Sequence, residues 1–251
     1  HVVRVPNGAN LQAALEQYRA QPEVFYAEPN YMLETVRTPD DARFDELWGL
    51  HNTGQAGGTE DMDVNAPEAW NITTGDRTVI VGVIDTGVDY NHPDLGANVW
   101  TNEDEIPGNG VDDDNNGYVD DIHGYDFVND DGDPMDDEGH GTHCAGTIGA
   151  VGNNGVGVVG VNWNVRIMAL KFMDNTGTGS TADAIRAVDY AVDLGAHLTN
   201  NSWGGGSYSQ ALRDSIEAAQ EAGHLFVAAA GNDGSNNDSI PHYPSNYDLD
   251  N

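Results

Sequence analysis

The alternation of strand-like and helix-like segments constrains the fold of this chain more than any other feature. Continuous aliphatic runs are typical of strands buried on both faces, and the segments between them carry apolar positions at helical spacing behind serine caps. In chain order the segments are 78–85 (strand), 165–172 (strand), 180–196 (helix), 197–202 (strand), 209–223 (helix) and 224–232 (strand). This order predicts an α/β fold, a parallel sheet with helices on both faces.

The composition limits the classes of function. With 251 residues, 38% of them hydrophobic, the chain can bury one sizeable core, and no apolar run is long enough to span a membrane. The 42 acidic and 9 basic residues give a formal net charge of −33, which argues against binding nucleic acid. Two explanations of this charge stay open. One is a soluble acidic exoprotein, and the other is a salt-adapted protein whose melting temperature rises with KCl because salt screens self-repulsion.

The first residues form a unit of their own in this interpretation. A strand at 2–6, a helix capped by Asn10 and a strand at 24–33 make a small α+β piece that buries too little surface to be stable alone. A polar, proline-containing segment follows it. The expected divisions are therefore a small unit at 1–35, a linker and start of the main chain at 36–64, and a large domain at 65–251.

Three motifs stand at or near the ends of expected strands. They supply a carboxylate in VIDTGVD (Asp85), an imidazole in HGTHCAGT (His140) and a carboxamide in FVAAAGNDG (Asn232). Each motif alone has another explanation: Asp-Thr-Gly also occurs in aspartic proteases, and two histidines three apart can bind a metal or pack in a helix. Because the carboxyl ends of parallel strands meet at one edge of a sheet, the three together indicate a single hydrolytic site.

In this order the motifs resemble the subtilisin-like serine proteases (subtilases, peptidase family S8), and the resemblance covers nearly all of the chain. It implies that Asp85 is the triad acid, His140 the base and Asn232 the donor to the oxyanion. It also implies that His143 is a packed supporting residue. Cys144 lies where the family has a small buried residue, so we do not expect a cysteine nucleophile.

The nucleophile is missing from the sequence. In the family it is a serine in Gly-Thr-Ser-Met-Ala, and none of the serines here has that context. We therefore expect a catalytic domain truncated before its serine, inactive alone, whose full-length parent is a secreted serine endopeptidase with its export signal removed. The main alternative is a non-catalytic, calcium-binding secreted module or pseudoenzyme. A glycosidase that uses two of the many carboxylates explains the motifs less well. The coding sequence beyond Asn251 would decide.

The resemblance also implies how substrate and propeptide bind. A polypeptide substrate would add as a strand to one glycine-containing edge and lie against a second, which walls the first specificity pocket. These edges are Gly177, Thr178 and Gly179, and Ser202, Trp203, Gly204 and Gly205. We expect a broad preference for large apolar side chains. Residues 1–35 resemble the end of an inhibitory propeptide, a partner in cis, with maturation between about Glu34 and Asp41.

Calcium is the expected cofactor, at two sites. The segment 112–121 has the Asp-x-Asp-x-Asn-Gly order of a calcium loop, although a solvated acidic insertion also explains it and position twelve is His123. Its expected ligands are Asp112, Asp114, Asn116, the Tyr118 carbonyl, Asp120 and Asp121. The resemblance implies a second site, formed by Asp94, Asn154 and the carbonyls of Val151, Val156 and Val158.

Overall fold

The computed structural model describes residues 2–6, 8–30 and 37–249 and divides the chain into two compact units, His1–Val36 and Arg37–Asn251. In the smaller unit, α1 (Leu11–Arg19) begins at Asn10, whose side chain accepts a hydrogen bond from the Ala13 N–H at 3.1 Å. The Arg19 side chain donates to the Ala27 carbonyl at 2.8 Å.

The two strands expected in the small unit are not formed at 2–6 or 24–30, and residues 31–33 of the second lie outside the described residues. This expectation was wrong where the chain is described, because an extended segment becomes a strand only when another strand satisfies its backbone groups. The expected maturation region, 34–41, also lies partly outside the described residues.

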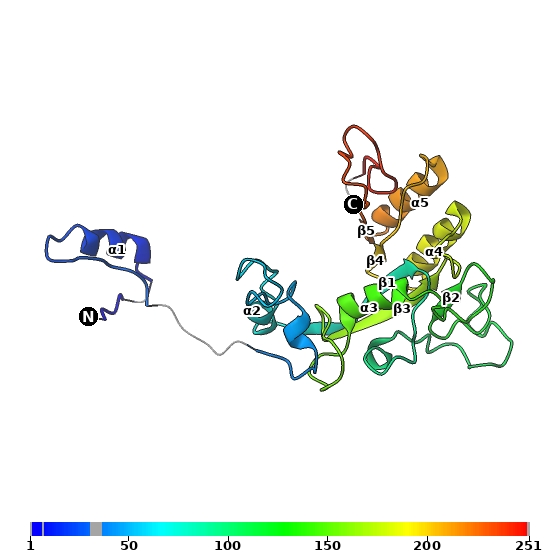
Figure 1. Cartoon of the computed structure of the whole chain (residues 1–251), viewed down its shortest axis with the longest axis horizontal. Coiled ribbons are helices and arrows are strands. Elements are labelled where there is room, and N and C mark those ends of the chain that lie inside the picture. Colours follow the sequence, from blue (N-terminus) through cyan, green and yellow to red (C-terminus); the bar gives the residue numbers. More distant parts are fainter. Residues whose placement is uncertain (1, 7, 31–36, 250–251) are drawn as a thin grey trace. The chain divides into compact units, whose positions relative to one another are not determined.

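The larger unit is built on a parallel five-stranded sheet of order β2-β3-β1-β4-β5 (Figure 1). The strands are β1 (Gly75–Asp85), β2 (Gly124–Asp126), β3 (Asn164–Lys171), β4 (Leu198–Asn201) and β5 (Leu225–Ala228). The helices are α2 (Ala66–Trp70), α3 (His140–Gly149), α4 (Thr181–Asp193) and α5 (Gln210–Glu221), with 3₁₀ turns η1 (Phe44–Glu46) and η2 (Gly96–Asn98). The predicted α/β class and parallel sheet are confirmed.

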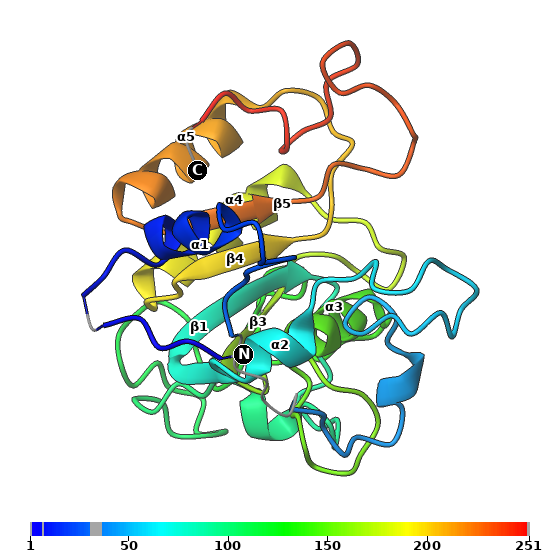
Figure 2. The ribbon, with the colours of Figure 1, turned by 90° about the vertical axis from the view of Figure 1, so that its left-hand side faces the viewer.

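Successive residues of β1 face opposite sides of the sheet and bury two different clusters. Ile80 and Ile84 belong to the cluster that contains α4 and α5, while Val81 and Val83 belong to the cluster that contains Ala145 of α3. Burying each aliphatic side chain is worth about 1.5–3 kcal/mol, so this central strand is anchored from both faces. Figure 2 shows β3, β1, β4 and β5 side by side.

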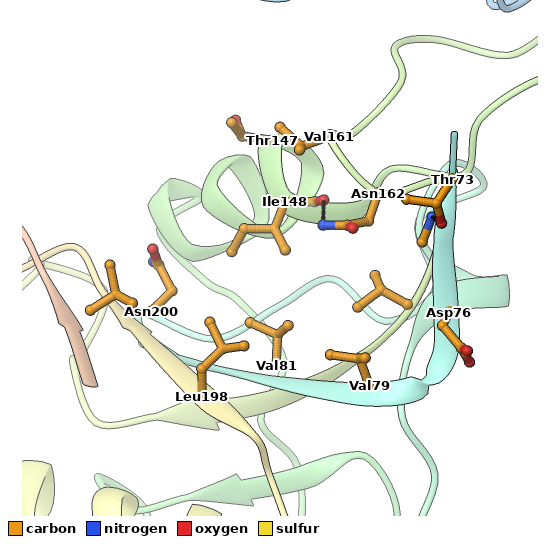
Figure 3. Close-up of a pocket in the computed structure, with 13 residues that line it drawn as sticks. Thr73, Asp76, Val79, Val81, Thr147, Ile148, Val161, Asn162, Leu198 and Asn200 are labelled. Carbon is orange, nitrogen blue, oxygen red and sulfur yellow. Dashed lines mark hydrogen bonds between the residues drawn. The ribbon is translucent and has the colours of Figure 1, made fainter. Parts of the chain in front are cut away.

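The face that carries α3 is only partly covered. Leu225 and Val227 of β5 remain 48% and 44% exposed. A cavity of about 560 Å³ opens between the sheet and α3. Figure 3 shows Val79, Val81 and Leu198 of the sheet on one side of it and Ile148 of α3 on the other. Among the described residues, no helix has the length and apolar character needed to cross a membrane.

Candidate functional site

Asp85 and His140 meet at the carboxyl edge of the sheet. Asp85 is the last residue of β1 and 1% exposed, whereas His140 is the first residue of α3. The His140 Nδ1 lies 2.7 Å from the Asp85 Oδ1. A carboxylate can only accept, so Nδ1 carries the proton and Nε2 keeps its lone pair. The hydrogen bond to Asp85 raises the pKa of His140 above its ordinary value, against the opposing effect of partial burial.

The turn that follows β1 is locked to the start of α3. Thr86 donates its backbone N–H to the Asp85 Oδ1 at 2.8 Å, and its hydroxyl accepts the Gly141 N–H at 2.9 Å. A Cβ on Gly141 would lie 2.1 Å from the Gly87 carbonyl oxygen, so only glycine fits there. The two motifs are therefore held in close contact by their own backbones.

Asp136 braces the loop that leads into α3. Its Oδ1 accepts from the Thr86 hydroxyl at 2.9 Å and the Gly139 N–H at 2.8 Å, and its Oδ2 accepts from the Thr142 N–H at 2.9 Å. Burial raises the pKa of Asp136, but hydrogen bonds from Thr142, Gly139 and Glu138 outweigh burial and lower it below the ordinary value. Asp136 was not expected from the sequence, although it lies four positions before His140 in an acidic run.

Lys171 adds a buried positive charge beside the turn that follows β1. It is 2% exposed, and its Nζ donates to the Thr86 carbonyl at 2.7 Å and to the Asp137 Oδ1 at 2.6 Å. A buried ammonium that is paired and hydrogen-bonded fixes the geometry of its partners. The carboxylate–imidazole pair therefore lies on a rigid support.

Two neighbours of His140 on α3 have different surroundings from it. The Cys144 Sγ lies 3.9 Å from the His140 Nδ1, and burial raises the pKa of the thiol, which disfavours the thiolate that a cysteine nucleophile needs. His143 is exposed. The expectation that His143 is a packed supporting residue is therefore wrong.

The two expected substrate edges follow β3 and β4. Met173 bridges to Gly179 in an antiparallel pair, which turns residues 177–179 into an exposed hairpin edge. Ser202 accepts the Asn200 side-chain amide at 2.9 Å. The ring of Trp203 instead packs inward, with centroids 4.9 Å from Phe172 and 6.3 Å from Phe226. Gly204 and Gly205 are exposed, as is Asn232 beyond the end of β5.

The expected calcium loop brings together some of its residues and not others. Ligand atoms of Asp114 and Asp121 lie within 4.8 Å of each other and of Glu105, a residue that the sequence analysis missed. The Asp112 carboxylate instead accepts backbone N–H groups of Asn116 and Gly117, and that of Asp120 accepts those of Asn109 and Gly110. The ring of Tyr118 packs against aromatic neighbours, 4.6 Å from Tyr125 and 4.9 Å from Tyr190.

The three clustered carboxylates are embedded in amide and hydroxyl donors. Asn116 donates to the Asp121 Oδ2 at 2.9 Å, and the Tyr190 hydroxyl donates to the same oxygen at 2.5 Å. Burial raises the pKa of Asp121, and the neighbouring charge of Asp114 adds to the effect. Since calcium binds carboxylate and carbonyl oxygens, the oxygens of these three carboxylates fit the ion.

The second expected site gathers around Asp94, which is 2% exposed. Its carboxylate accepts from the Asn154 side chain at 2.9 Å and the Val158 N–H at 2.8 Å, and its carbonyl accepts the Val151 N–H at 2.8 Å. Val156 donates its N–H to the Asn154 Oδ1 at 2.7 Å. Three residues of this loop thus bond directly to Asp94.

Asp41 joins this loop from far away in the sequence. Its Oδ2 accepts the Asn153 N–H at 2.7 Å, while its Oδ1 is buried without a partner. Burial raises the pKa of Asp41, and the charge of Asp94 raises it further. A buried carboxylate oxygen that lacks a donor, close enough to a second carboxylate for its charge to act, fits a cation. Asp41 lies 53 positions before Asp94 in a polar segment, and nothing in its spacing marks it as a ligand.

Comparison with known proteins agrees with this geometry. The family model described as the subtilase family matches residues 76–249, and the fervidolysin N-terminal prodomain model matches residues 1–30. A thermophilic serine proteinase of Bacillus sp. (strain AK1) is 36% identical over 95% of this chain and 51% of its own length. The subtilisin-like protease 1 of Plasmodium vivax is 46% identical over 60% of this chain and 24% of its own length.

A solved protease structure from Pseudoalteromonas arctica superposes with a TM-score of 0.63 at 31% identity, covering 84% of this chain and 64% of that one. The chain thus spans about half, or less, of the length of these two curated relatives. The family model alone accounts for well over half of the residues, and the parallel sheet and the motif order agree with it. The chain belongs to the subtilase family of serine proteases.

Proposed function

We propose that this chain is part of a secreted, calcium-stabilised serine endopeptidase in which Asp85, His140 and Asn232 act with a serine from outside these 251 residues. The single observation that carries the proposal is the 2.7 Å contact between the His140 Nδ1 and the Asp85 Oδ1. That contact leaves the Nε2 lone pair facing away from Asp85, where a serine hydroxyl can give up its proton.

In the reaction, His140 removes the proton of the serine as its oxygen attacks the peptide carbonyl, and Asp85 stabilises the imidazolium that forms. The proton then passes from His140 to the leaving amine. A water molecule, which His140 deprotonates in the same way, then attacks the acyl-enzyme and releases the acyl group. The Asn232 amide donates to the oxyanion, an interaction worth about 3 kcal/mol, a value obtained on a member of this family. Substrate lies between the edges at 177–179 and 202–205, and residues 1–30 act as a prodomain.

The incompletely covered face of the sheet supports a serine from elsewhere. α3 starts beside Asp85 at the carboxyl edge and runs back across β1 and β3. A second helix laid beside α3 over β4 and β5 would cover Leu225 and Val227, both about half exposed, and fill the cavity of Figure 3. Such a helix would also begin at the carboxyl edge, which places its first residues near His140.

Calcium has a structural role in this proposal. Asp41, Asp94 and the loop 151–158 would hold one ion, and Glu105, Asp114 and Asp121 with neighbouring oxygens would hold a second. The first site would connect the segment around Asp41 to the loop after α3. The second would neutralise the acidic segment that is joined to α4 through the Asp121–Tyr190 hydrogen bond.

Labelling with a serine-directed phosphonate tests the proposal. The full-length protein should be labelled once and lose its peptidase activity, the His140→Ala variant should stay unlabelled, and the isolated 251-residue chain should be neither labelled nor active. A full-length protein that is folded but resists the label would contradict the proposal and favour a non-catalytic module. Peptidase activity of the 251-residue chain that survives purification and is blocked by the phosphonate would contradict the external serine.

A further inference from the structure

The imidazole of His242 lies between the two glycine-rich segments that leave β4 and β5. A Cβ built on Gly204 would lie 2.2 Å from the His242 Cε1. A Cβ built on Gly231 would lie 2.9 Å from both the Cδ2 and the Nε2 of the same ring. Distances this short mean that the ring rests directly on the bare backbone of both segments. The space between the two segments is therefore occupied by a side chain of the protein itself.

The ring is held there by its own loop. His242 donates its backbone N–H to the Asn246 Oδ1 at 2.8 Å, and the Ser245 hydroxyl donates to the His242 carbonyl at 2.8 Å. The Gly205 N–H donates to the Tyr243 carbonyl at 3.0 Å, and Gly206 bridges to Tyr243. The loop around 242–246 is thus docked onto the segment that follows β4 and cannot move away as a whole without breaking these bonds.

Ser245 also orients the ring. The Ser245 hydroxyl donates its proton to the His242 carbonyl. Its oxygen, 3.3 Å from the His242 Nδ1, can therefore only accept a hydrogen bond from that nitrogen. With Nδ1–H directed at Ser245, the ring presents Cε1 and Nδ1 to Gly204 and Cδ2 and Nε2 to Gly231. The other large side chain of this region, Trp203, packs inward against Phe172 and does not fill the gap.

We propose that His242 is a specificity-determining residue that shortens the first specificity pocket, so that the enzyme cleaves after small residues such as alanine and excludes large aromatic ones. The inference rests on the proposed function, in which the edge 202–205 walls the first specificity pocket and Asn232 donates to the carbonyl oxygen of the residue before the scissile bond. The glycines permit close approach of a substrate from outside, while the imidazole limits how deep its side chain reaches. This proposed preference for small residues differs from the preference for large apolar side chains that the resemblance led us to expect.

The test compares kcat/KM of the full-length enzyme on peptide anilides that differ only in having alanine or phenylalanine before the scissile bond. Phosphonate titration normalises each preparation to its active sites, so a poorly folded fraction does not distort the ratio. The wild-type protein should favour alanine at least about tenfold, the scale on which pockets discriminate groups of this size. His242→Gly should raise the phenylalanine-to-alanine ratio at least about tenfold, and His242→Gln, which keeps most of the bulk, should leave it near the wild-type value.

A wild-type enzyme that cleaves after phenylalanine as well as after alanine would overturn the inference, even if the glycine variant fails to fold. A folded His242→Gly variant with an unchanged ratio would overturn it as well. In both cases the protein is labelled by the phosphonate, so the proposed function stands. An unlabelled, inactive full-length protein would instead overturn the proposed function and the inference with it.

Discussion

Two buried carboxylates in this protein, Asp85 and Asp41, differ chiefly in what lies opposite them. Each is at most 5% exposed, and each has one oxygen buried without a partner among the described residues. Asp85 faces an imidazole that can take up a proton, whereas Asp41 faces a second carboxylate, Asp94, whose charge raises its pKa. On the proposed function, the same burial would let Asp85 stabilise the transient imidazolium and let Asp41 bind a calcium ion.

The largest effect should come from removing the charge at the first carboxylate. Asp85→Asn keeps the shape of the side chain but lets the imidazole adopt the wrong tautomer, so kcat of the full-length enzyme should fall about 10⁴-fold. Steady-state kinetics with phosphonate-titrated protein measure it. Asp61→Asn, which removes an exposed charge, serves as the control. A loss of less than about tenfold would mean that Asp85 does not support His140 in the reaction.

Calcium removal should have an intermediate effect on stability, and part of that effect should depend on Asp41. An ion at 100 times its Kd stabilises the folded state by about 2.7 kcal/mol, which corresponds to roughly 5–10 °C in melting temperature for a domain of this size. Calorimetry with and without a chelator measures the shift. Asp41→Asn should remove most of the calcium-dependent rise in melting temperature that comes from the site at Asp41 and Asp94. Glu105→Gln should remove the rise that comes from the site at Glu105, Asp114 and Asp121. The control variant Asp61→Asn should keep the full rise. Identical melting temperatures with and without calcium would contradict both sites.

The smallest expected effect is a dependence of stability on pH that arises from the pairing of Asp85 with His140. Asp85 raises the pKa of His140, so the pair stabilises the folded state below the unfolded histidine pKa of about 6.5 and loses that contribution as pH rises through the raised value. The stability difference between wild type and Asp85→Asn should therefore be larger at low pH than at high pH. NMR titration should find the His140 pKa above its ordinary value in wild type and lower in Asp85→Asn. Equal values in the two proteins would contradict the pairing.

The sequence predicted the parts of the fold whose signal is local. β1 and β3 appear as continuous aliphatic runs, and α4 and α5 begin at Ser180 and Ser209, whose side chains accept helix N–H groups as expected. β2 was missed because its three residues, Gly124–Asp126, contain no apolar run, and α2 because its five residues, Ala66–Trp70, are too few for helical periodicity.

The sequence predicted the site only as far as its motifs extend. Asp85 and His140 lie in recognisable motifs at strand and helix ends, so their meeting could be anticipated. Asp41, Glu105 and His242 could not be found in this way, because each reaches its neighbours only through the tertiary fold, with no motif or spacing of its own. The acidic loop also shows the limit of spacing, since Asp112 and Asp120 use their oxygens to cap backbone N–H groups.

A crystal structure of the full-length protein tests the central claim most directly. The account predicts a serine Oγ from outside these 251 residues within about 2.6–3.2 Å of the His140 Nε2, with the His140 Nδ1 still on Asp85 and the Asn232 amide directed at the same point. A structure in which another side chain covers the His140 Nε2, or in which Asp85 and His140 separate, would contradict it.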